Sequence, residues 1–535
     1  MSVTSSSLPL RVSLRSDMYP RGVPYLHADS LGGKDVKVNK TSRRDVLVGG
    51  LGLMGAGVLA SCGIRSGGSA TSSAVSGSFG APRPMNAAAG QRVVDASLTA
   101  TETTVDLGSG VTARTWAYGG VVPGKVVRAN AGDFIRAKVT NRLPADTTIH
   151  WHGVQLRNPA DGVPGVTQDP IASGDTFVYE FTAPNAGTHF FHPHVGVQID
   201  RGLYAPLIID DPGERGDYDD EWIVVLDDWT DGVGQNPDDI LAGYQAQNGT
   251  LSGMGGMGGG SMPGMGGSSS SPLGDAGDVD YPYYLINGRV PTAPTSFSSK
   301  PGRRIRIRLI NAGADTIFKV ALGGHQMTVT HSDGYPVVPR TTRSLYIAMG
   351  ERYDVIVTAG DGVFPLVADA EGKSGQALAL LRTAAGTAPS AMVHPTELDS
   401  AALLGASDLT AADSAQLPAK NPDGTLIVQL DGQMTPYAWG INGKKYGADT
   451  PMTVHADQRV RMRMTNMTAM VHPMHIHGHS WALPASGGLR KDTVLIRPME
   501  TIVADFQADN PGDWAFHCHN IYHAEVGMMT TVRYT

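Results

Sequence analysis

The chain has 535 residues, which is enough for about three domains of ordinary size. Hydrophobic residues make up an ordinary 41%, and the 67 glycines suit many short strands joined by turns. The formal net charge of −8 gives no reason to expect a nucleic acid as a partner.

The N-terminal 62 residues read as an export signal that is not part of the fold. Ser42–Leu47 (SRRDVL) resembles a twin-arginine signal, and the apolar run that follows is shorter than a membrane span. This run ends in Leu-Ala-Ser-Cys, which resembles a lipobox, although an incidental cysteine is the alternative. We therefore expect export by the twin-arginine route and a lipid anchor on Cys62, at the outer face of the cytoplasmic membrane or elsewhere in the cell envelope. Residues 63–90 are rich in Ser, Gly and Ala and are interpreted as a flexible tether.

One strand pattern occurs three times in the rest of the chain. Residues 132–141 (GDFIRAKVTN), 302–311 (GRRIRIRLIN) and 457–466 (DQRVRMRMTN) each alternate apolar and polar positions and end in Asn. Short alternating segments separated by turn residues favour antiparallel β-sandwiches. We predict an all-β chain with one sandwich in each of residues 91–212, 213–390 and 420–535, and a linker at 391–419.

Four histidines recur with identical spacing in the first and third domains. His150, His152, His192 and His194 return 325 residues later as His475, His477, His517 and His519. Eight imidazoles on two copies of one domain predict a metal cluster between the copies. The second domain has Val320 where the other two begin this pattern, so it is expected to hold no metal.

The third domain carries a second set of ligand types. On a strand, His517 and His519 point one way and Cys518 the other, so the thiolate faces a different site from the imidazoles. Cys518 with His472, His523 and Met528 makes up the ligand set of a blue-copper electron-transfer site. We expect Cys518 to be a ligand and no disulfide to form with Cys62.

At this point the chain resembles the laccase-like multicopper oxidases over residues 91 to the end. The motifs that match are HWHG (150–153), HPH (192–194), HPMHIH (472–477) and HCH-x₃-H-x₄-M (517–528). The resemblance implies three cupredoxin-like Greek-key domains and four copper ions. It implies a type 1 copper on His472, Cys518, His523 and Met528, and a type 2 copper on His150 and His475. The type 3 pair would take His152, His192, His194, His477, His517 and His519.

The first domain lacks the blue-copper set. At the 325-residue offset, Cys518 corresponds to Pro193, His523 to Gln198, Met528 to Leu203 and His472 to Thr147. The sequence therefore predicts a single type 1 copper, in the third domain.

Two acids are candidate catalytic residues because reduction of O₂ needs protons. Asp161 matches the acid that family members place near the type 2 copper, although an Asp-Gly turn is equally expected at this position. Some relatives have Glu directly after the last type 1 histidine; here that residue is Ala524 and the acid is Glu525. Glu525 is therefore the weaker candidate.

A methionine-rich stretch within residues 251–272 suggests the substrate. Met254, Met257, Met262 and Met265 lie among Gly and Ser, where they cannot form a core, and thioethers select Cu(I). We interpret the stretch as a Cu(I)-collecting loop; a low-complexity linker is the alternative.

The sequence thus predicts a monomeric oxidase that couples four one-electron oxidations to reduction of O₂ to water. The resemblance is strongest to the lipidated oxidases that protect mycobacteria and their relatives from copper, so Cu(I) is the expected substrate. A laccase acting on small phenols is the main alternative. A non-catalytic copper-binding cupredoxin is disfavoured because every histidine and cysteine of the pattern is present, and a copper nitrite reductase lacks the paired His-x-His arms.

Overall fold

The structure is a computed structural model that describes residues 84–535 except 215, 252–270, 272, 275–276 and 404. The predicted signal, the tether up to residue 83, Cys62 and the four methionines of the glycine-rich stretch lie outside the described residues. None of the described helices has the length and apolar character needed to cross a membrane.

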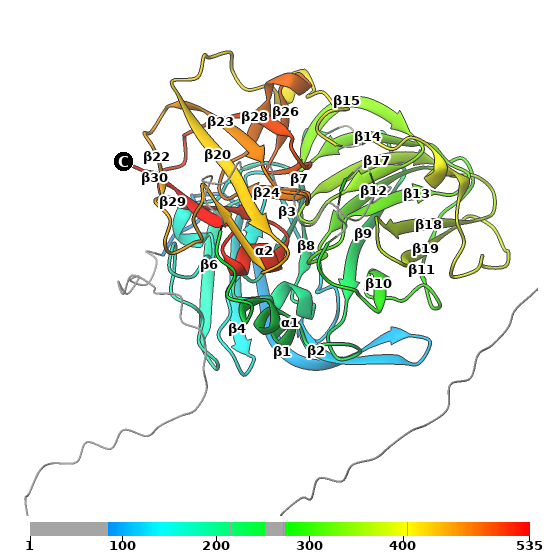
Figure 1. Cartoon of the computed structure of the whole chain (residues 1–535). Coiled ribbons are helices and arrows are strands. Elements are labelled where there is room, and N and C mark those ends of the chain that lie inside the picture. Colours follow the sequence, from blue (N-terminus) through cyan, green and yellow to red (C-terminus); the bar gives the residue numbers. More distant parts are fainter. Residues whose placement is uncertain (1–83, 215, 252–270, 272, 275–276, 404) are drawn as a thin grey trace, which may run out of the picture. The chain divides into compact units, whose positions relative to one another are not determined.

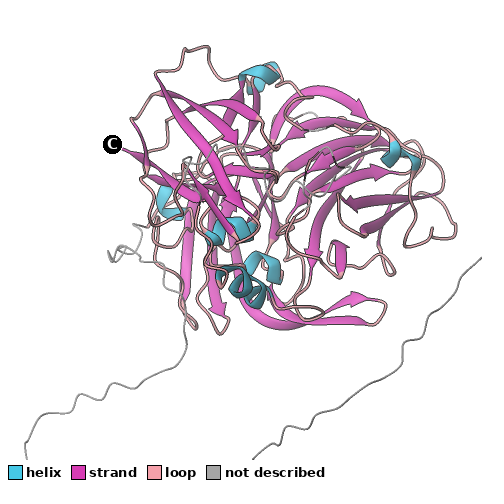
Figure 2. Ribbon diagram, in the orientation of Figure 1, coloured by secondary structure: helices cyan, strands magenta, loops and turns pink. Residues whose placement is uncertain are grey.

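Strands dominate the described chain and form six sheets, which pair into three sandwiches (Figure 2). The first sandwich contains β1 (Val93–Gly108), β2 (Val111–Tyr118), β3 (Val127–Asn130), β4 (Phe134–Arg142), β5 (His150–His152), β6 (Thr176–Thr182), β7 (Gly187–His192) and β8 (Ala205–Asp210). Its sheets have the orders β2-β1-β4-β6 and β3-β8-β7-β5.

The second sandwich is the largest. It contains β9 (Asp220–Trp229), β10 (Tyr283–Ile286), β11 (Thr295–Ser298), β12 (Arg304–Asn311), β13 (Phe318–Leu322), β14 (Met327–Ser332), β15 (Tyr335–Thr342), β16 (Leu345–Ile347), β17 (Arg352–Thr358), β18 (Val363–Ala370) and β19 (Gln376–Arg382). Its sheets have the orders β10-β9-β12-β17-β14-β15 and β11-β19-β18-β13-β16. Helix α1 (Pro237–Gln245) follows β9.

The third sandwich repeats this plan. It contains β20 (Gly424–Gln433), β21 (Ala438–Ile441), β22 (Met452–Val454), β23 (Arg459–Asn466), β24 (His472–Ile476), β25 (Trp481–Leu483), β26 (Leu489–Lys491), β27 (Thr493–Ile496), β28 (Thr501–Gln507), β29 (Asp513–Cys518) and β30 (Met529–Tyr534). Its sheets have the orders β21-β20-β23-β28-β25-β26 and β22-β30-β29-β24-β27. Helix α2 (Ile521–Val526) connects β29 to β30.

The all-β, cupredoxin-like fold is confirmed, but the sheets are mixed rather than purely antiparallel. The first strand of each sandwich pairs in parallel with the strand that carries the repeated pattern: β1 with β4, β9 with β12 and β20 with β23. A sandwich connection that crosses from one sheet to the other brings such strands together in parallel, and alternation along a strand does not reveal this.

The repeated strand is the centre of each sandwich because its apolar face is fully covered. The aligned residues Ile135, Ile305 and Val460 are at most 3% exposed. The closing Asn has one function in all three copies: its side-chain amide donates to two backbone carbonyls farther along the chain. Asn141 binds Ala145 and Ile171, Asn311 binds Thr316 and Ile347, and Asn466 binds Met470 and Ile496.

The sandwiches are also linked to one another. The β1–β2 hairpin extends beyond the first sandwich (Figure 1), and Leu107 near its tip packs against Trp229 and Leu285 of the second. Residues 391–419, predicted as a linker, contain short 3₁₀ turns and pair with the second sandwich through Ala411 and Leu403. The domain limits themselves stay a prediction.

Candidate metal centre

Four strands carry the repeated histidines or end just before them. In the first sandwich, β5 and β7 are neighbours and His150 pairs with His192. In the third sandwich, β24 and β29 are neighbours and His475 pairs with His517. The repeated spacing in the sequence therefore corresponds to one repeated pair of adjacent strands.

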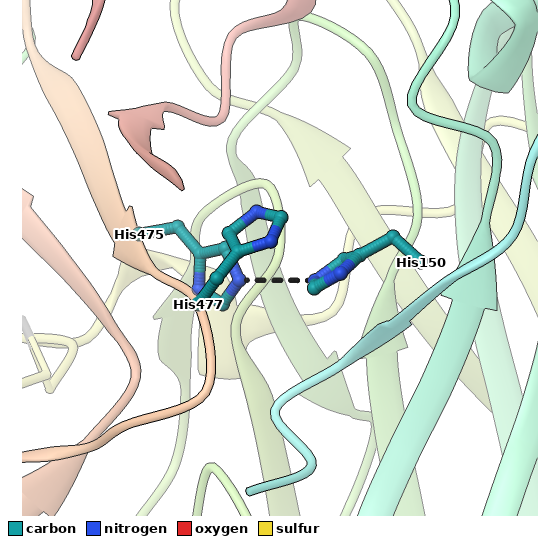
Figure 3. A group of neighbouring side chains, drawn as sticks. All are labelled: His150, His475 and His477. Atoms are coloured by element: carbon teal, nitrogen blue, oxygen red, sulfur yellow. Dashed lines mark hydrogen bonds between the residues drawn. The ribbon is translucent and has the colours of Figure 1, made fainter. Parts of the chain in front are cut away.

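The two arms meet and bring eight imidazoles together. Nε2 of His150 lies 3.3 Å from Nε2 of His475, and Nε2 of His194 lies 3.3 Å from Nε2 of His517. Figure 3 shows His150 directed toward His475 and His477 from the opposite side. The His152 and His475 rings stack at 3.8 Å, and the ring centroids of His192 and His519 are 5.3 Å apart.

The donor set fits metal ions. A neutral imidazole has only one N–H group, so hydrogen bonds among the rings cannot satisfy all of their nitrogens. Several nitrogens indeed have no hydrogen-bond partner among the described residues: Nδ1 of His152, Nε2 of His192 and both nitrogens of His519. Burial lowers the pKa of His192, His477 and His519 well below its usual value. Burial thus favours the neutral form of these three imidazoles, which is the form that binds metal.

A second group lies on the other side of Cys518. Its Sγ is 3.6 Å from Nδ1 of His472 and 3.7 Å from Nδ1 of His523, and these two nitrogens are 3.1 Å apart. All three side chains are completely buried. Burial raises the pKa of the thiol, so binding of a metal ion must displace its proton.

Backbone contacts hold this group in place. Met528 is completely buried; its carbonyl accepts from Cys518 N at 3.0 Å and its own N–H donates to the His523 carbonyl at 2.8 Å. Asn520 caps α2 by accepting from the N–H groups of Tyr522 and His523. The indole of Trp439, which the motifs did not indicate, packs on the His523 ring with centroids 4.2 Å apart.

Asp161 lies at the histidine cluster rather than in a solvated turn. Its Oδ2 is 2.9 Å from Nδ1 of His477, and its Oδ1 is 3.2 Å from Nδ1 of His150. The Asp161 carboxylate orients His477, while the Asp161 backbone carbonyl, 3.0 Å from Nδ1 of His150, orients the imidazole from the first sandwich. Only 1% of Asp161 is exposed.

Two further carboxylates contact predicted ligands and were missed from the sequence. Oδ1 of Asp492 lies 3.1 Å from Nε2 of His152, while the Asp492 carbonyl is 2.9 Å from Nδ1 of His475. Oδ2 of Asp278 lies 3.0 Å from Nε2 of His523. Neither acid belongs to a motif, so no sequence signal identifies them.

Glu525 does not touch the imidazoles but shares a cavity with one of them. This surface cavity of about 380 Å³ is lined by Glu525, His194, Asp146 and Lys445, among others. Burial raises the pKa of Glu525 to about 7. The carboxyl group is thus able to take up and release a proton near neutral pH beside a cluster ligand.

Known proteins match this chain over nearly all of its described length. Three sequence models, each described as multicopper oxidase, match residues 99–214, 220–386 and 419–535. Multicopper oxidase MmcO of Mycobacterium tuberculosis is 46% identical, covering 90% of this chain and 96% of its own. A copper resistance protein A homolog of Pseudomonas syringae pv. tomato is 30% identical, covering 82% of this chain and 91% of its own.

The chain is also similar to solved structures of multicopper oxidases and laccases. The laccase from Botrytis aclada is 25% identical with a TM-score of 0.63, covering 83% of this chain and 88% of its own. Fet3p, a multicopper oxidase that functions in iron import, has a TM-score of 0.70 over 83% of this chain and 90% of its own; at 21% identity it shows the fold alone. With three matching models and these relatives, the chain belongs to the multicopper oxidases, copper-dependent enzymes that use O₂ as electron acceptor.

Proposed function

We propose that this multicopper oxidase oxidises Cu(I) to Cu(II) in copper detoxification, in the balance 4 Cu(I) + O₂ + 4 H⁺ → 4 Cu(II) + 2 H₂O. The ligand sets are those predicted above: His472, Cys518, His523 and Met528 for type 1, and the eight clustered imidazoles for types 2 and 3. Bound copper would supply the one-electron chemistry. The chain itself buries most of the imidazoles of both groups and, through the Cys518–His517 and Cys518–His519 peptide links, joins the two groups covalently.

The observation that carries the choice of substrate is the buried carboxylate at the outer nitrogen of His523. Asp278 sits 3.0 Å from Nε2 of His523, and neither side chain is exposed. The Tyr437 hydroxyl donates to the same carboxylate oxygen, and the Tyr244 hydroxyl donates to the Asp278 carbonyl at 2.6 Å. These groups occupy the space at Nε2 of the imidazole, and a negative charge at this position attracts a small cation.

The described residues that flank the methionine-rich stretch support the same substrate. Before it, Gly249 accepts from Lys445 and Gln247 accepts from the Tyr437 N–H. After it, Gly274 lies against Ala469 and Pro498 of the third sandwich. Both described flanks thus contact the sandwich that carries the type 1 group, which supports delivery of Cu(I) to that group.

The test is O₂ consumption by the copper-loaded protein with Cu(I) and, separately, with a phenol. Asp278→Asn keeps an acceptor for His523 and removes the charge; Asp280→Asn is the matched control, an exposed acid two residues away. We expect Cu(I) turnover to fall roughly tenfold in Asp278→Asn, since loss of steering charge slows encounter, with phenol turnover nearly unchanged. A variant with Ser at positions 254, 257, 262 and 265 should lose Cu(I) turnover in the same selective way. Phenol turnover without Cu(I) turnover in the wild type would instead make the protein a laccase.

We also propose that the enzyme works as an exported monomer held by a lipid on Cys62. The twin-arginine pattern at Arg43 and Arg44 and the Leu-Ala-Ser-Cys sequence support this. Cys62→Ser should release the enzyme from the membrane fraction, and Lys at both arginine positions should keep it in the cytoplasm. Retention of Cys62→Ser in the membrane fraction would refute the anchor, and light scattering of a form that begins near residue 90 checks the monomer.

A further inference from the structure

The second sandwich supplies none of the clustered imidazoles, yet one of its loops reaches them. Arg352, the first residue of β17, is completely buried. Its Nη1 and Nη2 donate to Oδ1 and Oδ2 of Asp492, each at 2.6 Å. This two-point contact fixes the plane of the carboxylate as well as its position.

The carboxylate held in this way contacts predicted ligands from both other sandwiches. Asp492 Oδ1 lies 3.1 Å from Nε2 of His152, and 3.5 Å from Nδ1 of His475. Because Nε2 of His152 is directed at Asp492, the opposite nitrogen is left for the cluster. That nitrogen, Nδ1, has no hydrogen-bond partner within the described part of the chain.

Further hydrogen bonds fix the position of the Arg352 side chain. Its Nε donates to the Thr188 carbonyl of the first sandwich at 3.0 Å, and Nη1 also donates to the Gly350 carbonyl at 2.9 Å. A Cβ atom on Gly153, directly after His152, would lie 2.2 Å from Nη2. A Cβ atom on Gly350 would lie 2.7 Å from the His519 ring. Glycine at both positions therefore allows the Arg352 guanidinium and the Gly350 backbone to lie close to the clustered histidines.

We propose that Arg352 is a positioning residue for the predicted type 2 and type 3 copper ions: it holds Asp492, which contacts His152 and His475, so that both imidazoles present the correct nitrogens. This deepens the proposed function and rests on its ligand set. Without the two-point contact from Arg352, nothing of comparable geometry would fix the plane of the Asp492 carboxylate, and the carboxylate would turn. The two imidazoles would then lose their common orientation.

The substitution Arg352→Lys tests this because lysine keeps the positive charge but has no planar fork. We expect it to keep the blue type 1 absorption and to lose at least half of the type 2 electron paramagnetic resonance signal. O₂ consumption should fall about 10- to 100-fold, as for other partners of metal-binding residues. Arg306→Lys is the matched control: Arg306 is 3% exposed, pairs with Asp354 at 2.6 Å and is not in contact with the predicted ligands.

Two outcomes would overturn the proposal. One is wild-type type 2 copper content and turnover in Arg352→Lys. The other is a parallel loss of type 1 and type 2 signals together with a lower melting temperature of the copper-free protein, which would make Arg352 part of the fold only. If Arg352→Lys does not fold, Asp492→Asn is measured in its place, and a full type 2 signal in that variant would also contradict the proposal. A wrong choice of substrate is distinguishable, because it changes the ratio of Cu(I) to phenol turnover and leaves the type 2 signal untouched.

Discussion

The first and third sandwiches have the same framework and the same histidine arms, yet only the third contains the blue-copper group. Where the third has His472 and His523 with nitrogens 3.1 Å apart, the first has Thr147, whose hydroxyl donates to Gln198 Oε1 at 2.7 Å. Both positions are buried in both sandwiches. Thr147 and Gln198 thus satisfy each other by a hydrogen bond. In the third sandwich, the two imidazoles instead present their nitrogens beside the Cys518 thiol.

This comparison shows how one framework holds a predicted metal site in the third sandwich and a hydrogen-bonded core at the same positions in the first. A buried polar group must have a partner. Thr147 and Gln198 satisfy each other, and Gln198 Nε2 also donates to the Asp146 carbonyl at 2.7 Å. The position of Cys518 corresponds to Pro193, which has neither a thiol nor an N–H. Four substitutions therefore convert a site that needs a metal into ordinary core.

The largest contrast is expected between His472→Ala and Thr147→Ala. The first should abolish the blue absorption and the oxidase activity, because it removes a type 1 ligand. The second should cost about 1–3 kcal/mol of stability, because Gln198 Oε1 loses its buried donor, and should leave the copper content at four ions. Optical spectra and urea unfolding measure both. A change of copper content in Thr147→Ala would contradict the interpretation of the first sandwich as metal-free core at this position.

Substitutions of Asp161 and Asp146 test which acid of the first sandwich supports the histidine cluster. Asp161→Asn is expected to reduce O₂ consumption about 10- to 100-fold, because the carboxylate that orients His477 loses its charge. Asp146→Asn, at the rim of the Glu525 cavity, should change it less than threefold, roughly the effect of a surface substitution. Steady-state oxygen uptake with a saturating donor distinguishes them, and equal losses in both variants would remove Asp161 from its proposed role.

Substitution of the repeated asparagine tests how the second and third sandwiches differ. Asn466→Ala and Asn311→Ala each leave two buried carbonyls without their amide donor, so each should lower the unfolding free energy by about 1–3 kcal/mol. Of these two asparagines, Asn466 is the one that binds a carbonyl near a type 1 ligand, that of Met470, two residues before His472. The blue band should therefore shift in Asn466→Ala alone. A shift of the same size in Asn311→Ala would mean that the band reports general loosening of the fold.

The smallest effect is expected from Glu525→Gln and depends on pH. The folded pKa is raised to about 7, above the usual value near 4.3. The stability linked to this carboxyl group is therefore complete below the unfolded pKa and is lost as pH rises through about 7. Glu525→Gln, which resembles the protonated form, should melt like the wild type near pH 5 and at a higher temperature near pH 8. Glu102→Gln, an exposed acid, is the control; an equal shift at both pH values would contradict the raised pKa.

The sequence determined the parts of this protein that recur at fixed spacing. The alternating strands, their closing asparagines and the two sets of His-x-His arms all depend on local periodicity, so the triple repeat and the meeting of His150 with His475 could be predicted. The paired strands β5–β7 and β24–β29 realise that spacing directly. Even the absence of the blue-copper group from the first sandwich could be read at the 325-residue offset.

Only the tertiary structure decided which groups support the copper ligands. Arg352, Asp492 and Asp278 lie on strands and loops with no recognisable motif, and each touches a ligand or its partner that is distant in sequence; Arg352 and Asp492 are 140 residues apart. Likewise, parallel pairing of β1 with β4 follows from how the chain crosses between sheets, which side-chain alternation does not encode. Local patterns reflect the periodicity of one strand, whereas buried charges are paired by whichever sandwich packs against them.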